Sequence, residues 1–169
     1  MKRALVVIAK EGFQDVEEAG TRKGLASAGF EVIHASTEKG TCTGKFGGVI
    51  EAEVSLKDVN VANVDRVAFI GGPGAVNLWN NEDAKRIARD TVAAGKILGA
   101  ICIAPKILAA AGVLRGVNAT VWNDDGDQGI FLEDHGALYT DQLVIADGRI
   151  ITASGPDVAE KFGKEFADM

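Results

Sequence analysis

The sequence predicts a doubly wound α/β sandwich, in which helices cover both faces of a mostly parallel sheet. Short, fully apolar runs recur along the chain, as expected for parallel strands buried on both faces. Segments with apolar residues at helical spacing alternate with these runs. Asp147-Gly148 stands between two further apolar runs, which adds a small hairpin. A chain of 169 residues fits one domain with one core.

The strands are predicted from apolar runs that end at glycines and polar turns. Most of these runs are hydrophobic throughout, whereas residues 48–54 alternate in the manner of a half-exposed strand or hairpin. The turn-rich segment 37–44 before it is expected to be a loop and contains Cys42. The strands expected in chain order are residues 3–9, 30–36, 48–54, 66–70, 97–101, 119–122, 143–146 and 149–152.

Four helices are predicted from the spacing of apolar residues. Asp15 is placed to cap the first, and Glu17 and Glu18 suit the positive end of its dipole. The acidic segment 123–128 is expected to be a loop beside a site. The second helix has its expected buried side at Ala84, Ile87, Ala88 and Val92. The helices expected are 15–28, 82–94, the segment between Cys102 and Gly112, and 156–168.

Composition restricts the classes of function. The chain is 47% hydrophobic and 25% charged, and no apolar run approaches the ~20 residues that cross a bilayer. A net charge of -6 without a basic cluster argues against a nucleic-acid partner. The apolar start lacks the features of a signal peptide, so we expect a cytoplasmic protein without a membrane partner. Two cysteines and two histidines are too few for a disulfide framework or a closed zinc site, and no metal or cofactor is expected.

Cys102 lies at the bend between strand 97–101 and the helix that follows. A side chain on such a nucleophile elbow is exposed above the sheet, next to backbone N–H groups and the positive end of the helix. Both features lower the pKa of a thiol and favour the nucleophilic thiolate. The spacing alone leaves open a buried cysteine that acts as a small, inert hydrophobe.

Three turns are expected to meet at the carboxyl edge of the sheet, where ligands bind in this class of fold. They follow Ala9, Ile70 and Ile101. The first supplies the carboxylates of Asp15, Glu17 and Glu18, the second the backbone N–H groups of Gly71 and Gly72, and the third a thiol. Together they can provide a nucleophile, a proton-handling carboxylate and an oxyanion hole. The carboxylates can instead complement the helix dipole, and the glycines can form a tight connection or a phosphate cradle.

Five short motifs carry a resemblance to a known family. In chain order they are KRALVVIA at 2–9, DVE at 15–17, FIGG at 69–72, AICIAP at 100–105 and SGP at 154–156. Their order resembles that of the DJ-1/PfpI superfamily, over essentially the whole chain. The resemblance implies a flavodoxin-like sandwich over residues 1–169, related to class I glutamine amidotransferase domains and usually dimeric or built from dimers.

The resemblance also implies roles for individual residues. Cys102 is the expected nucleophile, and Glu17 is the carboxyl group that contacts it. A protonated Glu17 can donate a hydrogen bond to the thiolate and return a proton during catalysis. The expected oxyanion donors are the backbone N–H groups of Gly72 and Ile103, with Gly71 beside them.

Other residues of these turns are expected to have structural roles. If Glu17 contacts the thiol, Asp15 or Glu18 has a structural role. Gln14 is an alternative contact for the thiol. Cys42 resembles a loop cysteine of the branch near the human protein; it is either a second oxidisable thiol or incidental.

This chain departs from the family pattern in its histidines. Ile103 stands where the intracellular protease branch carries a histidine, and segment 120–123 lacks the histidine found in the branch near the human protein. His34 and His135 are expected to be packed or distant from the thiol. Peptide hydrolysis is therefore the least expected activity, because an amine leaving group needs a general acid.

Three hypotheses follow for function. In the first, Cys102 adds to an electrophilic carbonyl, as in the glyoxalase, deglycase, amidase and hydrolase activities of the family, on a small molecule or a modified protein. In the second, the chain is a stress-protective redox sensor whose Cys102 is reversibly oxidised under oxidative stress. In the third, it is a non-catalytic dimeric module. A homodimer is expected in each case.

Overall fold

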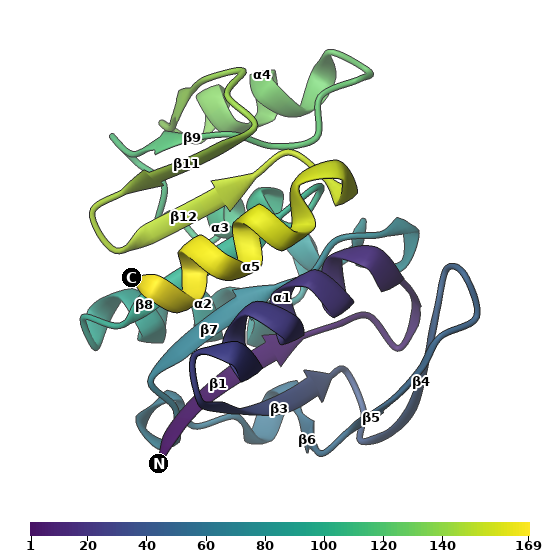
Figure 1. Cartoon of the computed structure of the whole chain (residues 1–169). Helices are drawn as coiled ribbons and strands as arrows, with labels where there is room; N and C mark the ends of the chain where they lie inside the picture. The colour runs from purple at the N-terminus through teal and green to yellow at the C-terminus, as the bar shows by residue number, and fades with distance from the viewer.

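The computed structural model describes all residues 1–169 and contains a central seven-stranded sheet with helices on both faces (Figure 1). Every neighbouring pair of strands is parallel except the hairpin at one edge. The predicted doubly wound sandwich with a mostly parallel sheet is confirmed. In spatial order the strands are β11 (Val144–Asp147), β12 (Ile150–Ala153), β8 (Ile97–Ile101), β7 (Arg66–Phe69), β1 (Lys2–Val7), β3 (Phe30–Ser36) and β6 (Val54–Ser55).

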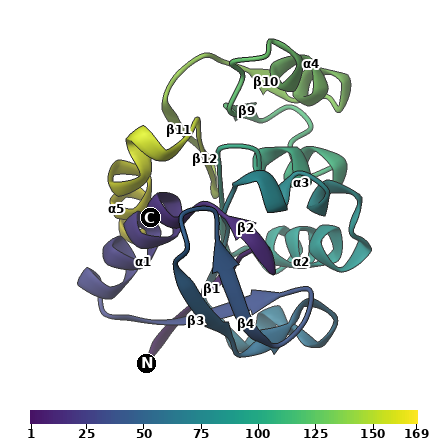
Figure 2. The same cartoon turned by 90° about the vertical axis from the view of Figure 1, so that its right-hand side faces the viewer.

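Five α-helices surround this sheet. They are α1 (Asp15–Ser27), α2 (Glu82–Ala93), α3 (Pro105–Ala110), α4 (Asp127–Asp134) and α5 (Ala159–Asp168). Helices α1 and α5 cover one face, whereas α2 and α3 cover the other (Figure 2). Alternate side chains of β1 enter two separate cores, with Leu5 and Val7 on one side and Val6 on the other, so the expectation of one core is wrong because the sheet divides the interior. None of the helices is long and apolar enough to cross a membrane.

Short elements connect and extend this framework. Two small sheets lie outside the central one: β2 (Glu11–Phe13), β4 (Gly40–Gly44) and β5 (Val49–Ala52) form the first, and β9 (Asn118–Ala119) and β10 (Leu138–Tyr139) the second. Single 3₁₀ turns occur at Leu56–Asp58, Val61–Asn63, Pro73–Ala75, Leu78–Asn80 and Pro156–Val158. Strand β5 confirms the half-exposed strand expected within 48–54, and its antiparallel partner β4 lies in segment 37–44, which was expected to be a loop.

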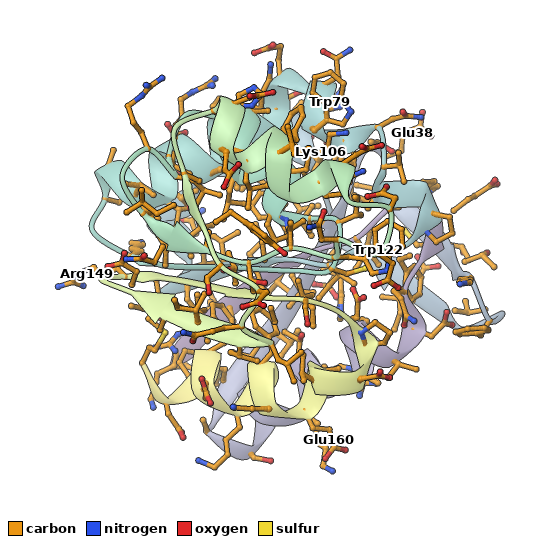
Figure 3. All side chains as sticks on the ribbon, turned by 90° about the horizontal axis from the view of Figure 1, so that it is seen from above. Glu38, Trp79, Lys106, Trp122, Arg149 and Glu160 are labelled. Atoms are coloured by element: carbon orange, nitrogen blue, oxygen red, sulfur yellow. The ribbon has the colours of Figure 1, made fainter.

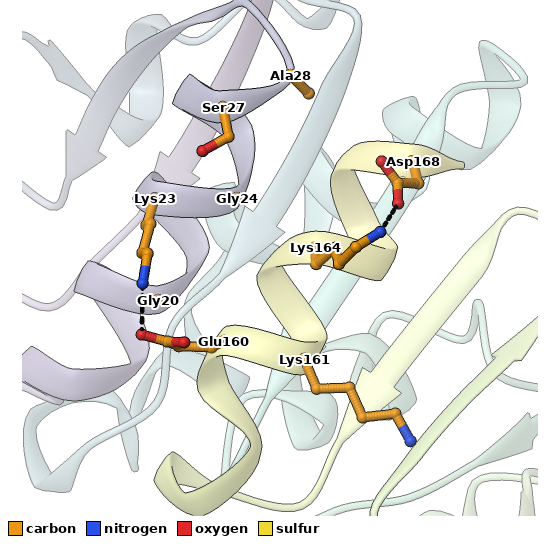
Figure 4. Close-up of a pocket in the computed structure, with 9 residues that line it drawn as sticks. All are labelled: Gly20, Lys23, Gly24, Ser27, Ala28, Glu160, Lys161, Lys164 and Asp168. Carbon is orange, nitrogen blue, oxygen red and sulfur yellow. Dashed lines mark hydrogen bonds and ion pairs between the residues drawn. The ribbon is translucent and has the colours of Figure 1, made fainter.

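Helices α1 and α5 pack closely because glycines face each other. A Cβ atom on Gly24 would lie 2.3 Å from the carbonyl carbon of Gly163, so no larger residue fits there. The groove of about 620 Å³ beside this contact is lined mainly by charged side chains and glycines. Its lysines are paired, with Lys23 Nζ 2.9 Å from Glu160 Oε1 and Lys164 bound to Asp168 (Figure 4).

Four local expectations were wrong. Cys42 is buried in strand β4 rather than in a loop, because its side chain enters the core beside β5. Segment 123–128 is not all loop, since α4 begins at Asp127. The strand expected at 119–122 ends at Ala119. Val92 is 40% exposed, because Thr91 takes the inward position and donates to the Ile87 carbonyl.

Candidate active site

Cys102 lies on the sharp bend between β8 and α3. Its φ is 63°, and it is the only residue other than glycine with a positive φ. An L-residue in this conformation is strained and persists only where its surroundings fix it. The Cys102 N–H donates to the Ala153 carbonyl at 2.9 Å, and its carbonyl accepts from the Trp122 N–H at 2.8 Å. Both neighbouring segments therefore hold the thiol in place.

Glu17 lies directly beside this thiol. The first turn of α1 places it in the protein interior, where its side chain is fully buried. Its Oε2 accepts from the Gly71 N–H at 2.9 Å, whereas its buried Oε1 has no hydrogen-bond partner. A Cβ atom on Gly71 would lie 2.7 Å from the Cys102 Cβ. Only glycine therefore fits between the carboxyl group and the thiol.

The two glycines after β7 have different roles. The backbone N–H groups of Gly72 and Ile103 act on the Cys102 thiol in the direction that lowers its pKa, as donors for an oxyanion at this point should. Gly71 lies beside these two expected donors, and its own N–H donates to Glu17 Oε2. Gly71 therefore holds the carboxyl group. Gly72 has a φ of 111°, and a Cβ there would lie 2.5 Å from the Gly12 carbonyl oxygen.

The thiol and the carboxyl group compete for a proton. Burial raises the pKa of Glu17 to about 7. Burial also raises the pKa of Cys102, and the negative charge of Glu17 raises it further, while the N–H groups of Ile103 and Gly72 act in the opposite direction. Burial and the Glu17 carboxylate thus oppose the lowering of the thiol pKa that the donors of the elbow favour. The thiolate is consequently favoured when Glu17 holds the proton.

Residues at the start of α1 differ from the expected roles in one respect. The helix is capped by Gln14, whose Oε1 accepts from the Val16 N–H at 2.7 Å, rather than by Asp15. Asp15 instead accepts from the N–H groups of Phe46 and Gly48, each at 2.8 Å. Its carboxylate joins the turn between β4 and β5 to the start of α1, which is a structural role.

Glu18 belongs to a separate cluster. Its Oε1 lies 2.9 Å from His34 Nε2 and 2.9 Å from Arg22 Nε. Burial alone would raise the pKa of Glu18, but the hydrogen bonds and charges of His34 and Arg22 together lower it. Glu18 and His34 stabilise the packing of α1 on β3 and do not line the thiol cavity.

Neither histidine reaches Cys102 within this chain. His34 is held by Glu18, and His135 lies at the end of α4 with Nδ1 2.8 Å from the Phe131 carbonyl oxygen. The His135 ring also stacks on the Phe131 ring at a centroid distance of 4.2 Å. No group of three His, Cys, Asp or Glu side chains is arranged to hold a metal ion.

A cavity of about 330 Å³ opens over the thiol. Its lining consists of Gln14, Lys45, Gly72, Pro73, Val76, Cys102, Ile103, Trp122 and Pro156. Trp122 and Pro156 also line a second hollow of about 490 Å³, whose acidic residues are Asp124, Asp141 and Asp157. Figure 3 shows Trp122 and Arg149 at opposite ends of the sheet. Arg149 directly precedes β12 and therefore marks the amino edge. Trp122 and the cavity that it lines lie near the carboxyl edge. Lys45 and Trp122 were not among the site residues predicted from the sequence.

The fold and this geometry define an α/β protein with a cysteine on a nucleophile elbow beside a buried carboxyl group. The chain belongs to the DJ-1/PfpI family, whose family model matches residues 2–169. It is 33% identical over 167 residues to a deglycase of Pyrococcus horikoshii, covering 99% of this chain and 98% of that protein. It is 30% identical over 169 residues to the glutathione-independent glyoxalase DJR-1.2 of Caenorhabditis elegans, covering 99% and 88%.

A solved structure shows the same fold. The ThiJ/PfpI domain protein from Brachyspira murdochii superposes with a TM-score of 0.93 at 28% sequence identity, covering 98% of this chain and 94% of that one. The flavodoxin-like architecture implied by the sequence motifs is thereby confirmed.

Proposed function

We propose that this protein is a cysteine-dependent enzyme of the glyoxalase or deglycase type. Its substrates would be small reactive carbonyl compounds or the adducts that such compounds form on proteins. The observation that carries the proposal is the position of Cys102 and Glu17, which both lie against Gly71 beneath an open cavity. The names of the relatives, a deglycase and a glyoxalase, support it.

The first chemical step forms a bond between sulfur and carbon. The Cys102 thiolate attacks the carbonyl carbon, and the electron pair of the C=O double bond moves onto oxygen. The N–H groups of Gly72 and Ile103 stabilise the developing oxyanion. Protonated Glu17 is near enough to the sulfur to supply the proton that converts this oxyanion into a hemithioacetal.

With a 2-oxoaldehyde the same carboxylate can complete an isomerisation. Glu17 removes the hydrogen of the hemithioacetal carbon as a proton, which gives an enediol, and a proton returns to the neighbouring carbon. The first carbon is thereby oxidised to a thioester and the second reduced to an alcohol, so no external oxidant is required. Water then hydrolyses the thioester, releasing a 2-hydroxy acid and the Cys102 thiol.

Turnover of methylglyoxal by matched cysteine variants tests this function. Cys102→Ala should abolish formation of lactate, whereas Cys42→Ala should retain it, because Cys42 is buried away from the cavity. A wild-type protein without turnover, or a Cys102→Ala variant that keeps it, would overturn the proposal. Thermal unfolding of both variants controls for loss of fold.

We further propose that the chain forms a homodimer in the cytoplasm. Three exposed apolar side chains, Val16, Phe46 and Val49, lie on the two segments joined by Asp15, and their burial in a dimer would be favourable. A reducing compartment would keep Cys102 as a thiol. Sedimentation analysis of the purified chain tests the dimer, and a monomer at micromolar concentration would contradict it.

A further inference from the structure

We propose that Lys45 selects substrates in which the reactive carbonyl compound also carries an anionic group, such as a carboxylate. Lys45 lines the cavity over Cys102 and is the only residue of that lining with a charged side chain. The inference rests on the proposed function, because it names the class of substrate that the same site prefers. Its test is separate from the test of the proposed function, because the Cys102 nucleophile forms without Lys45.

The fold places Lys45 at the cavity through a fixed turn. Lys45 lies in the turn between β4 and β5, and its N–H donates to the Phe13 carbonyl at 2.8 Å. The next residues of the turn are held by Asp15, which accepts from the Phe46 and Gly48 N–H groups. The backbone of Lys45 is therefore tied to both β2 and the start of α1. The backbone position from which the Lys45 side chain extends is therefore fixed beside the thiol cavity.

The charge of Lys45 has no carboxylate partner within the chain, and its ammonium group lies over the Phe46 ring. No carboxylate lies within 4.0 Å of its Nζ, which is 5.2 Å from the centroid of the Phe46 ring. By contrast, Lys23 and Lys164 in the groove between α1 and α5 are both paired with carboxylates (Figure 4). An exposed ammonium group without a partner can bind an anion without first breaking an ion pair.

The acidic groups near the site do not cancel this preference within the cavity. Glu17 is fully buried beneath the cavity and is not part of its lining. Asp124, Asp141 and Asp157 line the hollow on the other side of Trp122. Because Lys45 and Cys102 line the same cavity of about 330 Å³, a compound bound in that cavity can contact both. Its carboxylate would pair with Lys45 while its carbonyl meets the thiol.

Lys45 has one alternative role, which acts through Glu17. Its positive charge lowers the pKa of Glu17, although burial still raises that pKa to about 7. A change at Lys45 through this route alters the reactivity of the thiol toward every reagent equally. The ratio of rates for an anionic and a neutral reagent cancels that effect and isolates the recognition of charge.

Alkylation of Cys102 by iodoacetate and by iodoacetamide gives this ratio without any turnover. The two reagents differ chiefly in the carboxylate, and Cys42→Ala in all variants leaves one thiol to follow. Lys45→Met should lower the ratio of iodoacetate to iodoacetamide rates by about five- to tenfold, as expected for loss of one charge-assisted contact. Lys45→Arg should keep the ratio, and added salt should lower it in the wild type. An unchanged ratio in Lys45→Met would overturn the inference, even if the variant slows both reactions equally.

Turnover of phenylglyoxal and 4-carboxyphenylglyoxal extends the test to substrates. Lys45→Met should raise KM for the carboxylated compound about five- to tenfold relative to KM for phenylglyoxal, and any change of kcat through Glu17 should be the same for both compounds. Lys45→Arg should restore the lower KM. If the wild type converts methylglyoxal but neither of these compounds, the proposed function stands and the alkylation ratio alone decides the role of Lys45. A Cys102 that reacts with neither alkylating reagent would overturn both proposals.

Discussion

Glu17 and Glu18 are adjacent residues on the first turn of α1, and both are buried, with exposed fractions of 0% and 3%. Their environments nevertheless have opposite effects on protonation. The pKa of Glu17 is raised to about 7, whereas that of Glu18 is lowered. Successive residues of a helix point about 100° apart, so the two carboxyl groups enter different surroundings.

Burial raises the pKa of both groups, and only the partners of Glu18 are strong enough to reverse this effect. Glu17 meets the Gly71 N–H and the Cys102 thiol, neither of which carries a positive charge. Glu18 meets His34 and Arg22, which favour its ionised form. One helix turn therefore supplies both a carboxyl group able to exchange protons near neutral pH and a carboxylate that stabilises the fold. The sharpest tests remove each group separately.

Glu17→Gln is expected to have the largest effect on catalysis. Turnover should fall about 10²- to 10⁴-fold, because an amide cannot transfer the proton. The pKa of Cys102 should nevertheless fall, since the variant removes the charge and the acceptor that help to retain the thiol proton. Alkylation of Cys102 should therefore be faster at pH 8 while turnover is lost. Glu18→Gln, the matched control, should leave turnover within about threefold.

Either of two results would contradict this account. Slower alkylation of the Glu17→Gln variant across the pH range would show that the carboxyl group assists the thiolate more than it opposes it. Unchanged turnover would show that Glu17 does not transfer the proton.

The stability of the fold should depend on pH through Glu17. Because burial raises its pKa from 4.5 to about 7, the protonated form is favoured in the folded state. The stabilisation of the wild type relative to Glu17→Gln is complete below pH 4.5 and should be lost as pH rises to about 7. The expected change is about 3 kcal/mol, since each tenfold change in proton affinity is worth about 1.4 kcal/mol. Urea unfolding of both proteins at pH 5 to 8 measures it, and parallel curves would exclude the raised pKa.

Glu18→Gln should show the opposite dependence on pH. Its pKa is lowered in the folded state, so its contribution to stability is present above the unfolded pKa and lost as pH falls through the folded one. At pH 7 the variant should lose about 2 kcal/mol, because His34 would be left without its buried carboxylate. Urea unfolding at pH 7 and pH 4 separates the two carboxyl groups. A cost that does not fall at pH 4 would argue that packing, not charge, is lost.

The sequence predicts the parts of this site that depend on backbone pattern. The apolar run Ile97–Ile101 followed by a helix with Pro105 fixes the bend at Cys102, and the motif at 15–17 places Glu17 on the right helix turn. Helix α4 was missed because its apolar residues do not form a clear face and Gly129 interrupts it.

Properties that depend on three-dimensional surroundings were not predictable in the same way. The direction of the Cys102 pKa follows from burial and from the distance of a carboxylate that lies 85 positions earlier in the chain. Lys45 appears in the sequence as one charge in a glycine-rich turn. Only the hydrogen bonds from that turn to Asp15 and Phe13 bring it to the thiol cavity.

Lys23→Ala provides the smallest expected effect and completes the comparison of carboxylate partners. Lys23 and Glu160 form an ion pair at 2.9 Å, similar in length to that of Glu18 with Arg22, but their side chains are 66% and 75% exposed. Water screens such a pair, so the variant should lose less than about 0.5 kcal/mol at pH 7. Urea unfolding beside Glu18→Gln provides the test. If both variants lose the same free energy of unfolding, burial is not the reason that the Glu18 cluster stabilises the fold. If Lys23→Ala is nearly neutral, Glu18 stabilises the fold because it is paired where water cannot replace its partners.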